Sequence, residues 1–300
     1  MNRNLFYFFT LILSLNSCSE DLVSNVEDSS EPLNAYYYHV DYAKNNSESF
    51  IIEDPTIENK FTTEDGVILT FYPNSFLNDG QAYNGKVNLS FCGVFNQTDM
   101  ILSNLPTVGH SNTQGLSLLQ SGGEFLVRAM SEEEEALTAS QQYLVKIPND
   151  LMDESAPEMQ MFTLGEFVWR LQLEATEIEN FSNYYNILVD DFNWINCDKF
   201  LNFDGDLVDI EYVFPEGYTS YNSVFFNVLD KYPYSIASSY LNLPIGETGT
   251  VVFLSKTENF YYVGSAELKV EENLKIDFSE VELYQVSPDK IRKYISNLLK

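Results

Sequence analysis

The sequence predicts an all-β protein with two β-sandwich domains in tandem and a short C-terminal helix. From residue 50 onward, apolar and polar residues alternate in short runs, as strands with one buried face require. The turn sequences "NDG", "NG" and "SGG" separate these runs, and Gly and Asn accept the positive φ of hairpin turns. The 300 residues, of which 44% are hydrophobic and 20% charged, are enough for two full cores.

The first 17 residues are predicted to be a lipoprotein signal peptide. Arg3 supplies a positive charge, and residues 5–15 form an apolar stretch that is too short to span a bilayer as a stable helix. The following "LNSC" resembles a bacterial lipobox, which implies that Cys18 becomes the lipidated N-terminus and is held stably by several acyl chains. Asn16 is unusual in this motif, so a cleaved secretory peptide without lipid is the alternative.

Residues 18–34 are predicted to be an acidic, solvated tether, because they are poor in apolar residues and contain acids, Ser, Asn and Pro. Ser19-Glu20-Asp21 resembles the signal that sends lipoproteins of Bacteroidetes-type bacteria to the outside of the outer membrane. The resemblance implies an outer-membrane protein that faces the cell exterior. An orientation toward the periplasm is the alternative.

Residues 35–150 are predicted to form the first sandwich, with strands at 67–72, 86–91, 125–129 and 143–147. The four glutamates of "SEEEEALTAS", residues 131–140, indicate an exposed acidic hairpin loop rather than a helix. No amphipathic helix of ordinary length is expected in this half.

Residues 50–147 resemble the ZU5-like β-sandwich segment of surface lipoproteins of Bacteroidetes-type bacteria. The residues that carry the resemblance are Gly66, the strand 67–72, the turn Pro73-Asn74-Ser75-Phe76, Gly80, Gly85 and the strand 86–91. The resemblance implies the fold and little about function. Members of the family in animal proteins use the domain as a platform for other proteins.

The segment 148–166 has two Pro and no regular period, so it is predicted to connect the domains. Residues 165–300 are then expected to form the second sandwich, from seven or eight strands about ten residues apart. A helix is predicted at the end of the chain, where Ser287 can cap it and Pro288 can occupy its first position. We expect it to pack on the second sandwich through one apolar stripe, formed by Ile291, Tyr294, Ile295 and Leu298.

The charge balance excludes nucleic acid as a partner. The chain has 16 Lys and Arg against 45 Asp and Glu, a formal net charge of −29. Such a field repels phosphate backbones, which are bound by clusters of Lys and Arg. The surplus carboxylates could attract divalent cations or cationic partners, although a solvated, soluble surface is the simpler interpretation.

The residues do not indicate a catalytic site or a cofactor. His39 and His110 are the only His, and the sequence contains no HExxH motif. "GHSNTQG" lacks the Gly that a serine hydrolase needs two residues after Ser111. Cys92 and Cys197 are expected to be buried thiols in different domains, rather than a disulfide or nucleophiles.

One segment is a weak calcium candidate. "NFDGDLVD" could place oxygens around one turn, from Asn202, Asp204, Asp206 and Asp209. It lacks the order of ligands of a calcium loop, so a hairpin turn is the simpler interpretation. No other metal site is predicted.

Aromatic residues give the main indication of binding. "NAYYYHVDYA" concentrates four Tyr and His39, and an exposed cluster of this kind could stack on sugar rings or peptides. The alternative is that Tyr36 to Tyr38 begin a strand of the first domain. Trp194 is expected inside a sandwich core.

These observations favour a non-enzymatic surface lipoprotein that acts in binding, adhesion or envelope assembly. Its expected partners are the membrane, through the anchor at Cys18, and an extracellular protein or glycan. A secreted hydrolase of glycans or peptides that uses carboxylates is the alternative, and a purely structural envelope protein is a third. An enzyme should present a cleft with converging carboxylates of perturbed pKa, whereas a binding protein should present a groove with exposed aromatics.

Overall fold

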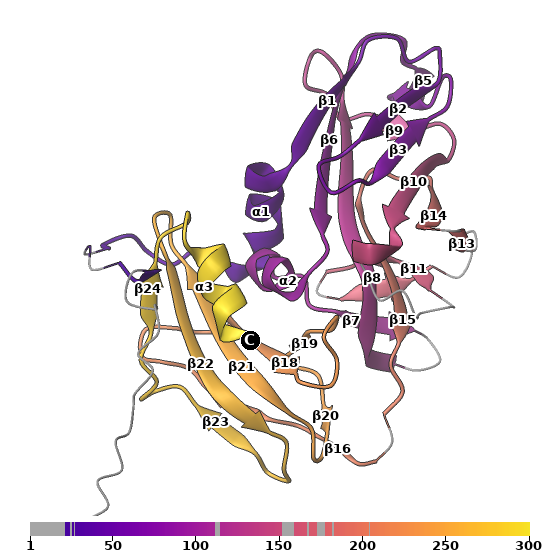
Figure 1. The fold of residues 1–300 in the computed structure, drawn as a ribbon. Helices are drawn as coiled ribbons and strands as arrows, with labels where there is room; N and C mark the ends of the chain where they lie inside the picture. The colour runs from indigo at the N-terminus through magenta and orange to yellow at the C-terminus, as the bar shows by residue number, and fades with distance from the viewer. Residues whose placement is uncertain are drawn as a thin grey trace, which may run out of the picture.

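The computed structural model describes residues 22–24, 26, 28–111, 115–151, 159–166, 168–172, 178–181, 183–203 and 205–300. Strands dominate these residues and the α-helices are short, which confirms the all-β class (Figure 1). Two sheet regions lie one above the other in Figure 1, and the helices lie where they meet. We call residues 48–200 the N-terminal sandwich and residues 205–300 the C-terminal region.

The first sheet of the N-terminal sandwich has seven strands. In spatial order these are β1 (Glu48–Ile52), β6 (Val87–Val94), β8 (Gly115–Met130), β15 (Trp194–Phe200), β11 (Gln160–Leu164), β12 (Trp169–Leu171) and β7 (Val108–Ser111). Neighbours are antiparallel except β12 and β7. Because β7 also pairs with the first part of β8, five strands of this sheet close into a ring.

The second sheet of the N-terminal sandwich has five strands. In order they are β13 (Glu179–Phe181), β14 (Tyr184–Val189), β10 (Tyr143–Pro148), β3 (Ile68–Phe71) and β2 (Asn59–Thr62). Three shorter strands form a flap, β5 (Gln81–Ala82), β4 (Phe76–Asn78) and β9 (Thr138–Ala139), and a 3₁₀ turn spans Asn149–Leu151. Alternate residues of both large sheets enclose an apolar core, so the strands expected near 67–72, 86–91, 125–129 and 143–147 are confirmed.

The turns of the N-terminal sandwich follow the sequence pattern. Gly66 and Gly80 have φ of 80° and 76°, and Asn74 has φ of 64°, which are left-handed conformations that Gly and Asn accept. Residues 132–136 form an exposed, non-helical loop after β8, as predicted for the acidic hairpin.

The predicted division of the chain at residues 150–165 is wrong. β11, β12 and β15 belong to the seven-stranded sheet, and β14 pairs with β10, so residues 160–200 complete the N-terminal sandwich. The apolar residues of these strands are needed to cover its core. Ile187 and Ile195 are both about 1% exposed within it. The Pro-containing segment therefore connects strands of one sandwich instead of two domains.

The C-terminal region is built on a second five-stranded sheet. Its order is β19 (Ala237–Ser238), β18 (Ser223–Leu229), β21 (Thr248–Lys256), β22 (Tyr261–Lys269) and β24 (Tyr284–Val286). Two short ribbons accompany it, β16 (Leu207–Val208) with β20 (Leu243–Pro244) and β17 (Glu211–Val213) with β23 (Lys275–Asp277). β21 pairs with β18, and position 249 requires Gly, because a Cβ there would lie 2.0 Å from the carbonyl oxygen of Val228 on β18.

The predicted C-terminal helix is confirmed as α3 (Ile291–Leu298). Ile291, Tyr294 and Ile295 are buried, so the expected apolar stripe packs inward. The expected cap is wrong, because α3 begins after Lys290 and no side chain caps it, while the Ser287 hydroxyl donates to the carboxylate of Asp289.

The part of the predicted tether that the structure describes is docked rather than solvated. Leu22 is 7% exposed, and the Ser24 N–H donates to the carbonyl of Gln285 on β24 at 2.6 Å. Asp28 accepts from the Thr257 hydroxyl at 2.6 Å, and the Leu33 N–H donates to β21. Apolar residues and backbone pairing therefore hold this acidic segment on the C-terminal sheet.

Two helices that the sequence analysis missed fill the junction between the sheets. They are α1 (Tyr38–Asn46), preceded by a 3₁₀ turn over Ala35–Tyr37, and α2 (Gln97–Ser103). The expectation that Tyr36 to Tyr38 begin a strand is therefore wrong. Each helical segment starts at an Asn whose side chain accepts from a backbone N–H of the first turn, Asn34 from Tyr36 and Asn96 from Asp99.

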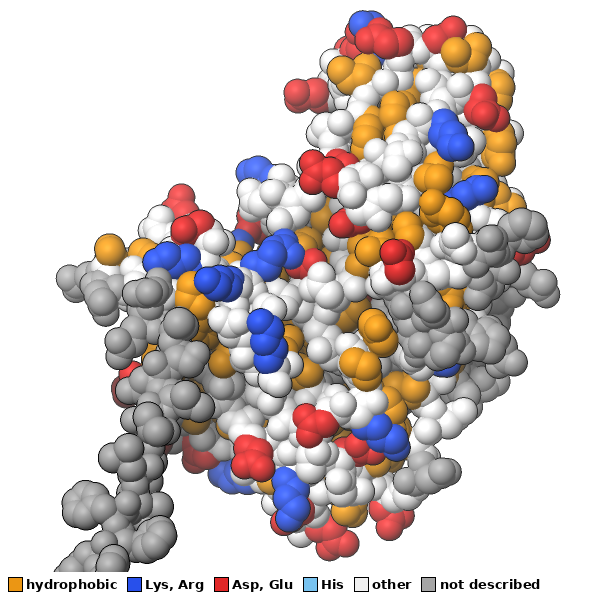
Figure 2. Space-filling view, in the orientation of Figure 1, with side chains coloured by type: hydrophobic (Ala, Val, Ile, Leu, Met, Phe, Trp, Pro, Cys, Tyr) orange, Lys and Arg blue, Asp and Glu red, His pale blue; other side chains and the backbone are white. Residues whose placement is uncertain are grey.

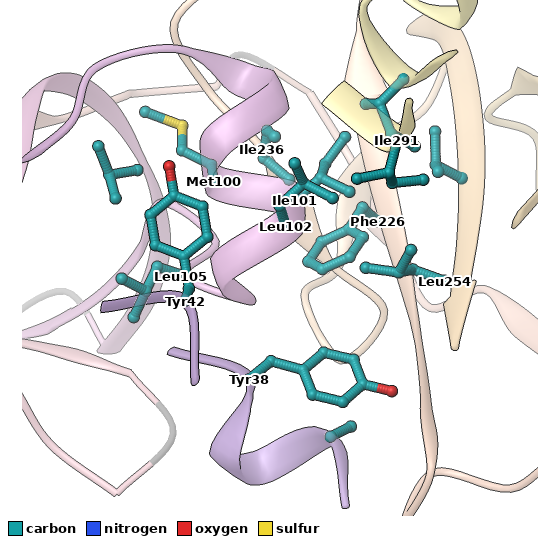
Figure 3. Close-up of a cluster of buried hydrophobic side chains, with 14 of the residues drawn as sticks. Tyr38, Tyr42, Met100, Ile101, Leu102, Leu105, Phe226, Ile236, Leu254 and Ile291 are labelled. Carbon is teal, nitrogen blue, oxygen red and sulfur yellow. The ribbon is translucent and has the colours of Figure 1, made fainter. Parts of the chain in front are cut away.

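The junction has its own hydrophobic core (Figure 3). Tyr38, Tyr42, Ile101 and Leu102 from α1 and α2 meet apolar residues of β18, β21 and α3 there. Trp194 is 3% exposed in the same cluster, so it is buried as expected, but between the regions and not inside the sandwich.

Candidate functional site

A pocket of about 670 Å³ opens at the junction, within the size range of ligand sites. Three walls line it. The first is the start of the helical segment, with Asn34, Ala35, Tyr36 and His39. The second belongs to the N-terminal sandwich, with Asn104, Leu105, Pro106, Leu164, Glu166, Val168 and Trp169. The third belongs to the C-terminal region, with Phe214, Ser220, Tyr221, Ser223, Val224, Phe225, Phe226, Ser238, Ser239 and Tyr240.

Tyrosines stand at the pocket with part of each side chain in solvent. Tyr36 is 39% exposed, Tyr221 66% and Tyr240 45%. Trp169, by contrast, is a buried wall residue at 1% exposure. The pocket therefore combines an apolar, aromatic interior with rings that a ligand can reach from outside.

The lining of the pocket is almost uncharged. Among the described residues that line the pocket, Glu166 is the one carboxylate, and none is Lys or Arg. Burial lowers the pKa of His39 below its ordinary value of 6.5, so this imidazole is neutral at pH 7. Its ring also meets Tyr36 edge to face, with ring centroids 6.0 Å apart. The pocket thus offers amides, hydroxyls and a neutral imidazole as polar partners.

Backbone contacts across the junction hold the tyrosine wall in place. The Ala35 N–H donates to the carbonyl of Tyr221 at 2.9 Å, and the Asn104 amide donates to the carbonyl of Ala35 at 3.1 Å. Asn104 itself ends α2 with φ of 53°, a left-handed conformation that Asn tolerates. The pocket walls from three parts of the chain are therefore tied to one another.

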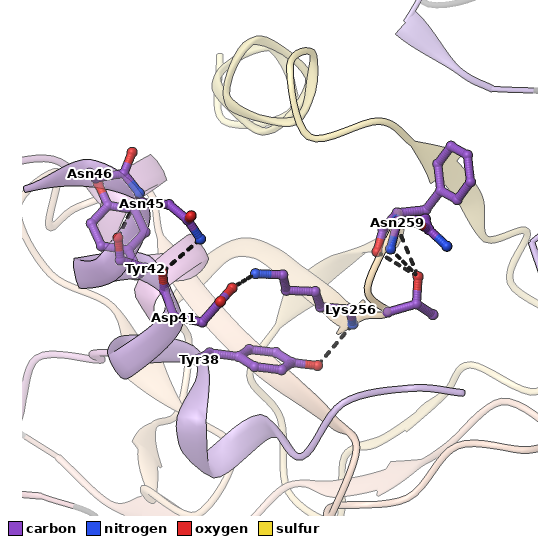
Figure 4. A network of polar contacts seen from close by, with 9 residues as sticks. Tyr38, Asp41, Tyr42, Asn45, Asn46, Lys256 and Asn259 are labelled. Atoms are coloured by element: carbon purple, nitrogen blue, oxygen red, sulfur yellow. Dashed lines mark hydrogen bonds and ion pairs between the residues drawn. The ribbon is translucent and has the colours of Figure 1, made fainter. Parts of the chain in front are cut away.

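A polar network fixes α1 on the C-terminal sheet (Figure 4). The Tyr38 hydroxyl accepts from the Lys256 N–H at 2.8 Å and donates to the carbonyl of Asn222 at 3.1 Å. The Lys256 ammonium pairs with Asp41. Burial lowers the pKa of Lys256, and the neighbouring carboxylate offsets the cost of keeping its charge.

Arg292 joins the three helices. Its guanidinium on α3 pairs with Asp99 on α2, and it donates to Tyr42 and Asn46 on α1, both at 3.2 Å. The Asp99 side chain is only 11% exposed, so this carboxylate depends on Arg292 for compensation.

A second polar cluster, made of Glu124, Asn196 and Asp198, lies inside the seven-stranded sheet region. Glu124 is directly opposite Asn196 in the β8–β15 pairing, and all three residues are fully buried. Asp198 accepts from the Gly122 N–H at 3.0 Å and from the Asn196 amide at 2.7 Å. Neither oxygen of Glu124 has a hydrogen bond of ordinary geometry among the described residues, although the Trp169 side chain is close enough to lower its pKa slightly against the effect of burial.

Burial shifts the titration of both carboxyl groups. It raises the pKa of Asp198 to about 7, against the lowering effect of its hydrogen bonds. Burial and the nearby Asp198 raise the pKa of Glu124 well above its ordinary value. Because neither side chain is exposed, the pair has no access to a substrate in solution.

The remaining predicted site residues are placed as follows. Cys18 lies outside the described residues, as does Asp204 of the calcium candidate, and the lipidation of Cys18 stays a prediction. Asp206 and Asp209 are exposed beside β16. Across the described part of the chain, no group of three or more His, Cys, Asp or Glu could hold a metal ion.

Cys92 and Cys197 are buried free thiols, as predicted. The expectation that they lie in different domains is wrong, since β6 and β15 are strands of one sheet. They face opposite sides of it, Cys92 the junction core and Cys197 the sandwich core. His110 and Ser111 lie on β7, so the "GHSNTQG" segment begins in a strand.

Within the described ranges, no helix is long and apolar enough to cross a membrane. The chain matches no family model, and no curated protein or solved structure is significantly similar to it. The ZU5-like resemblance therefore stays a prediction.

Of the pocket, the sequence analysis found one wall, the Tyr cluster with His39. It missed the other two walls, because Trp169, Tyr221 and Tyr240 are far apart in the sequence and only the junction brings them together.

Proposed function

We propose that the chain is a lipid-anchored outer-membrane protein that faces the cell exterior and binds an uncharged glycan in the junction pocket. The observation that carries the proposal is the lining: reachable tyrosines, an apolar wall, neutral amides and hydroxyls, and no cation. A sugar ring presents an apolar C–H face and a rim of hydroxyls, which such a lining complements. Binding of this kind would serve adhesion or envelope assembly.

Charge argues against an acidic ligand. A net charge of −29 repels anions at long range, and the pocket has no Lys or Arg to compensate at short range. Sialylated or sulfated glycans should therefore bind much more weakly than neutral ones.

A carboxylate-dependent hydrolase has less support. The carboxyl groups whose pKa is strongly raised, Glu124 and Asp198, are fully buried. Glu48 also has a raised pKa but does not line the pocket, to which the described residues contribute a single carboxylate, Glu166. Hydrolysis of a glycosidic bond by the usual mechanism needs two carboxyl groups on either side of the bond.

An array of oligosaccharides in neutral and sialylated forms tests the proposed ligand. We expect neutral members to bind, and Tyr221→Ala or Tyr240→Ala to weaken binding roughly two- to tenfold each, by loss of an aromatic contact. Tyr284→Ala is the matched control, since Tyr284 is 37% exposed outside the pocket. Binding of short peptides but not of sugars would show that the pocket serves an extracellular protein, and equal binding by both Tyr variants and the control would show that the pocket is not the site.

Fractionation of producing cells tests the anchor. Cys18→Ala should move the protein from the membrane fraction to the soluble fraction, because a single residue carries all the acyl chains. Protease added to intact cells should remove the unaltered protein. Membrane retention of the variant would contradict the anchor, and full protection of the protein would place it on the periplasmic side.

A further inference from the structure

We propose that the exposed face of α3 lies against anionic lipid headgroups when the chain is anchored through Cys18. The inference rests on the lipid anchor proposed above and adds which surface of the protein faces the membrane. Two independent observations support it, the charge of α3 and the distance between α3 and the anchor.

The C-terminal segment reverses the charge of the protein. Residues 290–300 contain Lys290, Arg292, Lys293 and Lys300 and no acidic residue, in a chain with a net charge of −29. Arg292 pairs with Asp99 on α2, so the three Lys supply the charge offered to a surface. Figure 2 shows Lys and Arg side chains gathered over α3. The apolar side of α3 is buried in the junction core, so the helix cannot insert that side into a bilayer. Lys293 on α3 and Lys300, two residues after the helix, are exposed and can meet a surface.

The predicted anchor is close to this helix. Leu22 belongs to the junction core together with Ile291 and Ile295, and Val23 forms a bridge with Val286, just before the turn into α3. Four residue steps separate Cys18 from Leu22, and an extended chain covers at most about 3.6 Å per residue. The acylated residue therefore lies within about 14 Å of the docked Leu22.

These two features orient the molecule. Because the anchor is short, the bilayer surface comes close to the edge of the C-terminal sheet that Leu22 covers. Lys and Arg next to an anionic leaflet are attracted within a Debye length of about 10 Å, whereas the acidic remainder of the protein is repelled. The cationic side of α3 then turns to the headgroups.

Acetylation of lysines in the anchored protein tests this orientation. The mature lipidated chain, purified in detergent, is compared in micelles and in vesicles of phosphatidylcholine with one third phosphatidylglycerol. We expect the vesicles to slow acetylation of Lys290, Lys293 and Lys300 roughly fivefold or more. Lys60 and Lys86, which are exposed on the N-terminal sandwich, serve as internal controls and should react equally in both.

A charge-reversed variant separates electrostatic contact from mere proximity. K293E/K300E changes two exposed side chains, so it should fold normally, and Lys290 should then lose its protection in the anionic vesicles. Failure of the unaltered protein to float with vesicles would overturn the anchor and with it the inference. Flotation with equal acetylation of α3 and control lysines would overturn the orientation and leave the anchor standing.

Discussion

The two faces of the seven-stranded sheet are made of alternate residues of the same strands, yet they differ in kind. On the inner face, Phe125, Ile195 and Cys197 lie in an uninterrupted apolar core. On the outer face, Trp194 lies in the junction core, and Glu124 and Asp198 are buried carboxyl groups. Burying a carboxyl group without a cation is costly, whereas burying apolar side chains is favourable. The inner face therefore stabilises the fold, whereas the outer face contains the carboxyl groups whose ionisation depends on pH.

The first prediction concerns the inner face and has the largest expected effect. Phe125→Ala should lower the free energy of unfolding by roughly 3 to 5 kcal/mol, because it removes a fully buried ring and leaves a cavity. Urea denaturation measures this loss, which should be the same at pH 4.5 and pH 7.5. A loss below about 1 kcal/mol would mean that this face tolerates large cavities and is not the main source of stability.

The second prediction concerns the outer face and depends on pH. The pKa of Asp198 is raised from 3.8 to about 7 in the folded protein. Between these values the unfolded state holds fewer protons than the native state, so this group makes the free energy of unfolding fall as pH rises from about 4 to 7. The full change is roughly 4 kcal/mol.

Asp198→Asn should remove this contribution. Relative to the unaltered protein, the variant should gain stability between pH 4.5 and pH 7.5 in urea denaturation, while Phe125→Ala should show no such gain. If the variant and the unaltered protein differ in stability by the same amount at pH 4.5 and at pH 7.5, the raised pKa of Asp198 is contradicted.

The third prediction concerns the ion pair that holds the helices together over the outer face. Arg292→Met should cost roughly 1 to 2 kcal/mol, since Asp99 would be left nearly buried without its cation while the half-exposed Arg292 is partly screened by solvent. Lys86→Met is the matched control, because Lys86 pairs with Glu53 at 2.7 Å where both side chains are well exposed. That control should cost much less than Arg292→Met, because solvent screens an exposed ion pair. Equal losses would mean that the junction is no more dependent on charge pairing than the surface.

The contrast between the faces also explains what the sequence could predict. Period-two alternation identified the strands around Val67, Phe91 and Val145. Their apolar residues point into the core, and the polar residues between them point away from it. The same rule failed at residues 160–200. β15 buries both of its sides, and although β14 does alternate, the pairing of these strands with β8 and β10 depends on contacts far apart in the sequence.

The missed helices have a related cause. α1 has three adjacent Tyr near its start and two Asn at its end, and α2 has only seven residues, all buried except the first. Such segments have no clear amphipathic period, and burial against neighbouring elements overrides their weak propensity. The pocket depends on these helical segments. The sequence predicted the Tyr cluster of the pocket, but not the helical contacts that bring its walls together.

The last prediction uses the two cysteines as probes of the two faces. Cys92 faces the junction core and Cys197 the sandwich core, and both are at most 1% exposed. Burial raises the pKa of Cys92 to about 12 and that of Cys197 well above its ordinary value, so neither thiol reacts quickly while the protein is closed.

Single-thiol chains, made from a Cys18→Ala background with either Cys197→Ala or Cys92→Ala, are labelled with a thiol reagent in low urea. If the junction opens as a unit of lower stability than the sandwich, Cys92 should be labelled sooner and with a weaker dependence on urea than Cys197. Arg292→Met should speed labelling of Cys92 more than that of Cys197, because the guanidinium ties the helices that cover Cys92. Identical rates with the same urea dependence would mean that both faces open together. The junction would then be part of one cooperative core and not a separate unfolding unit.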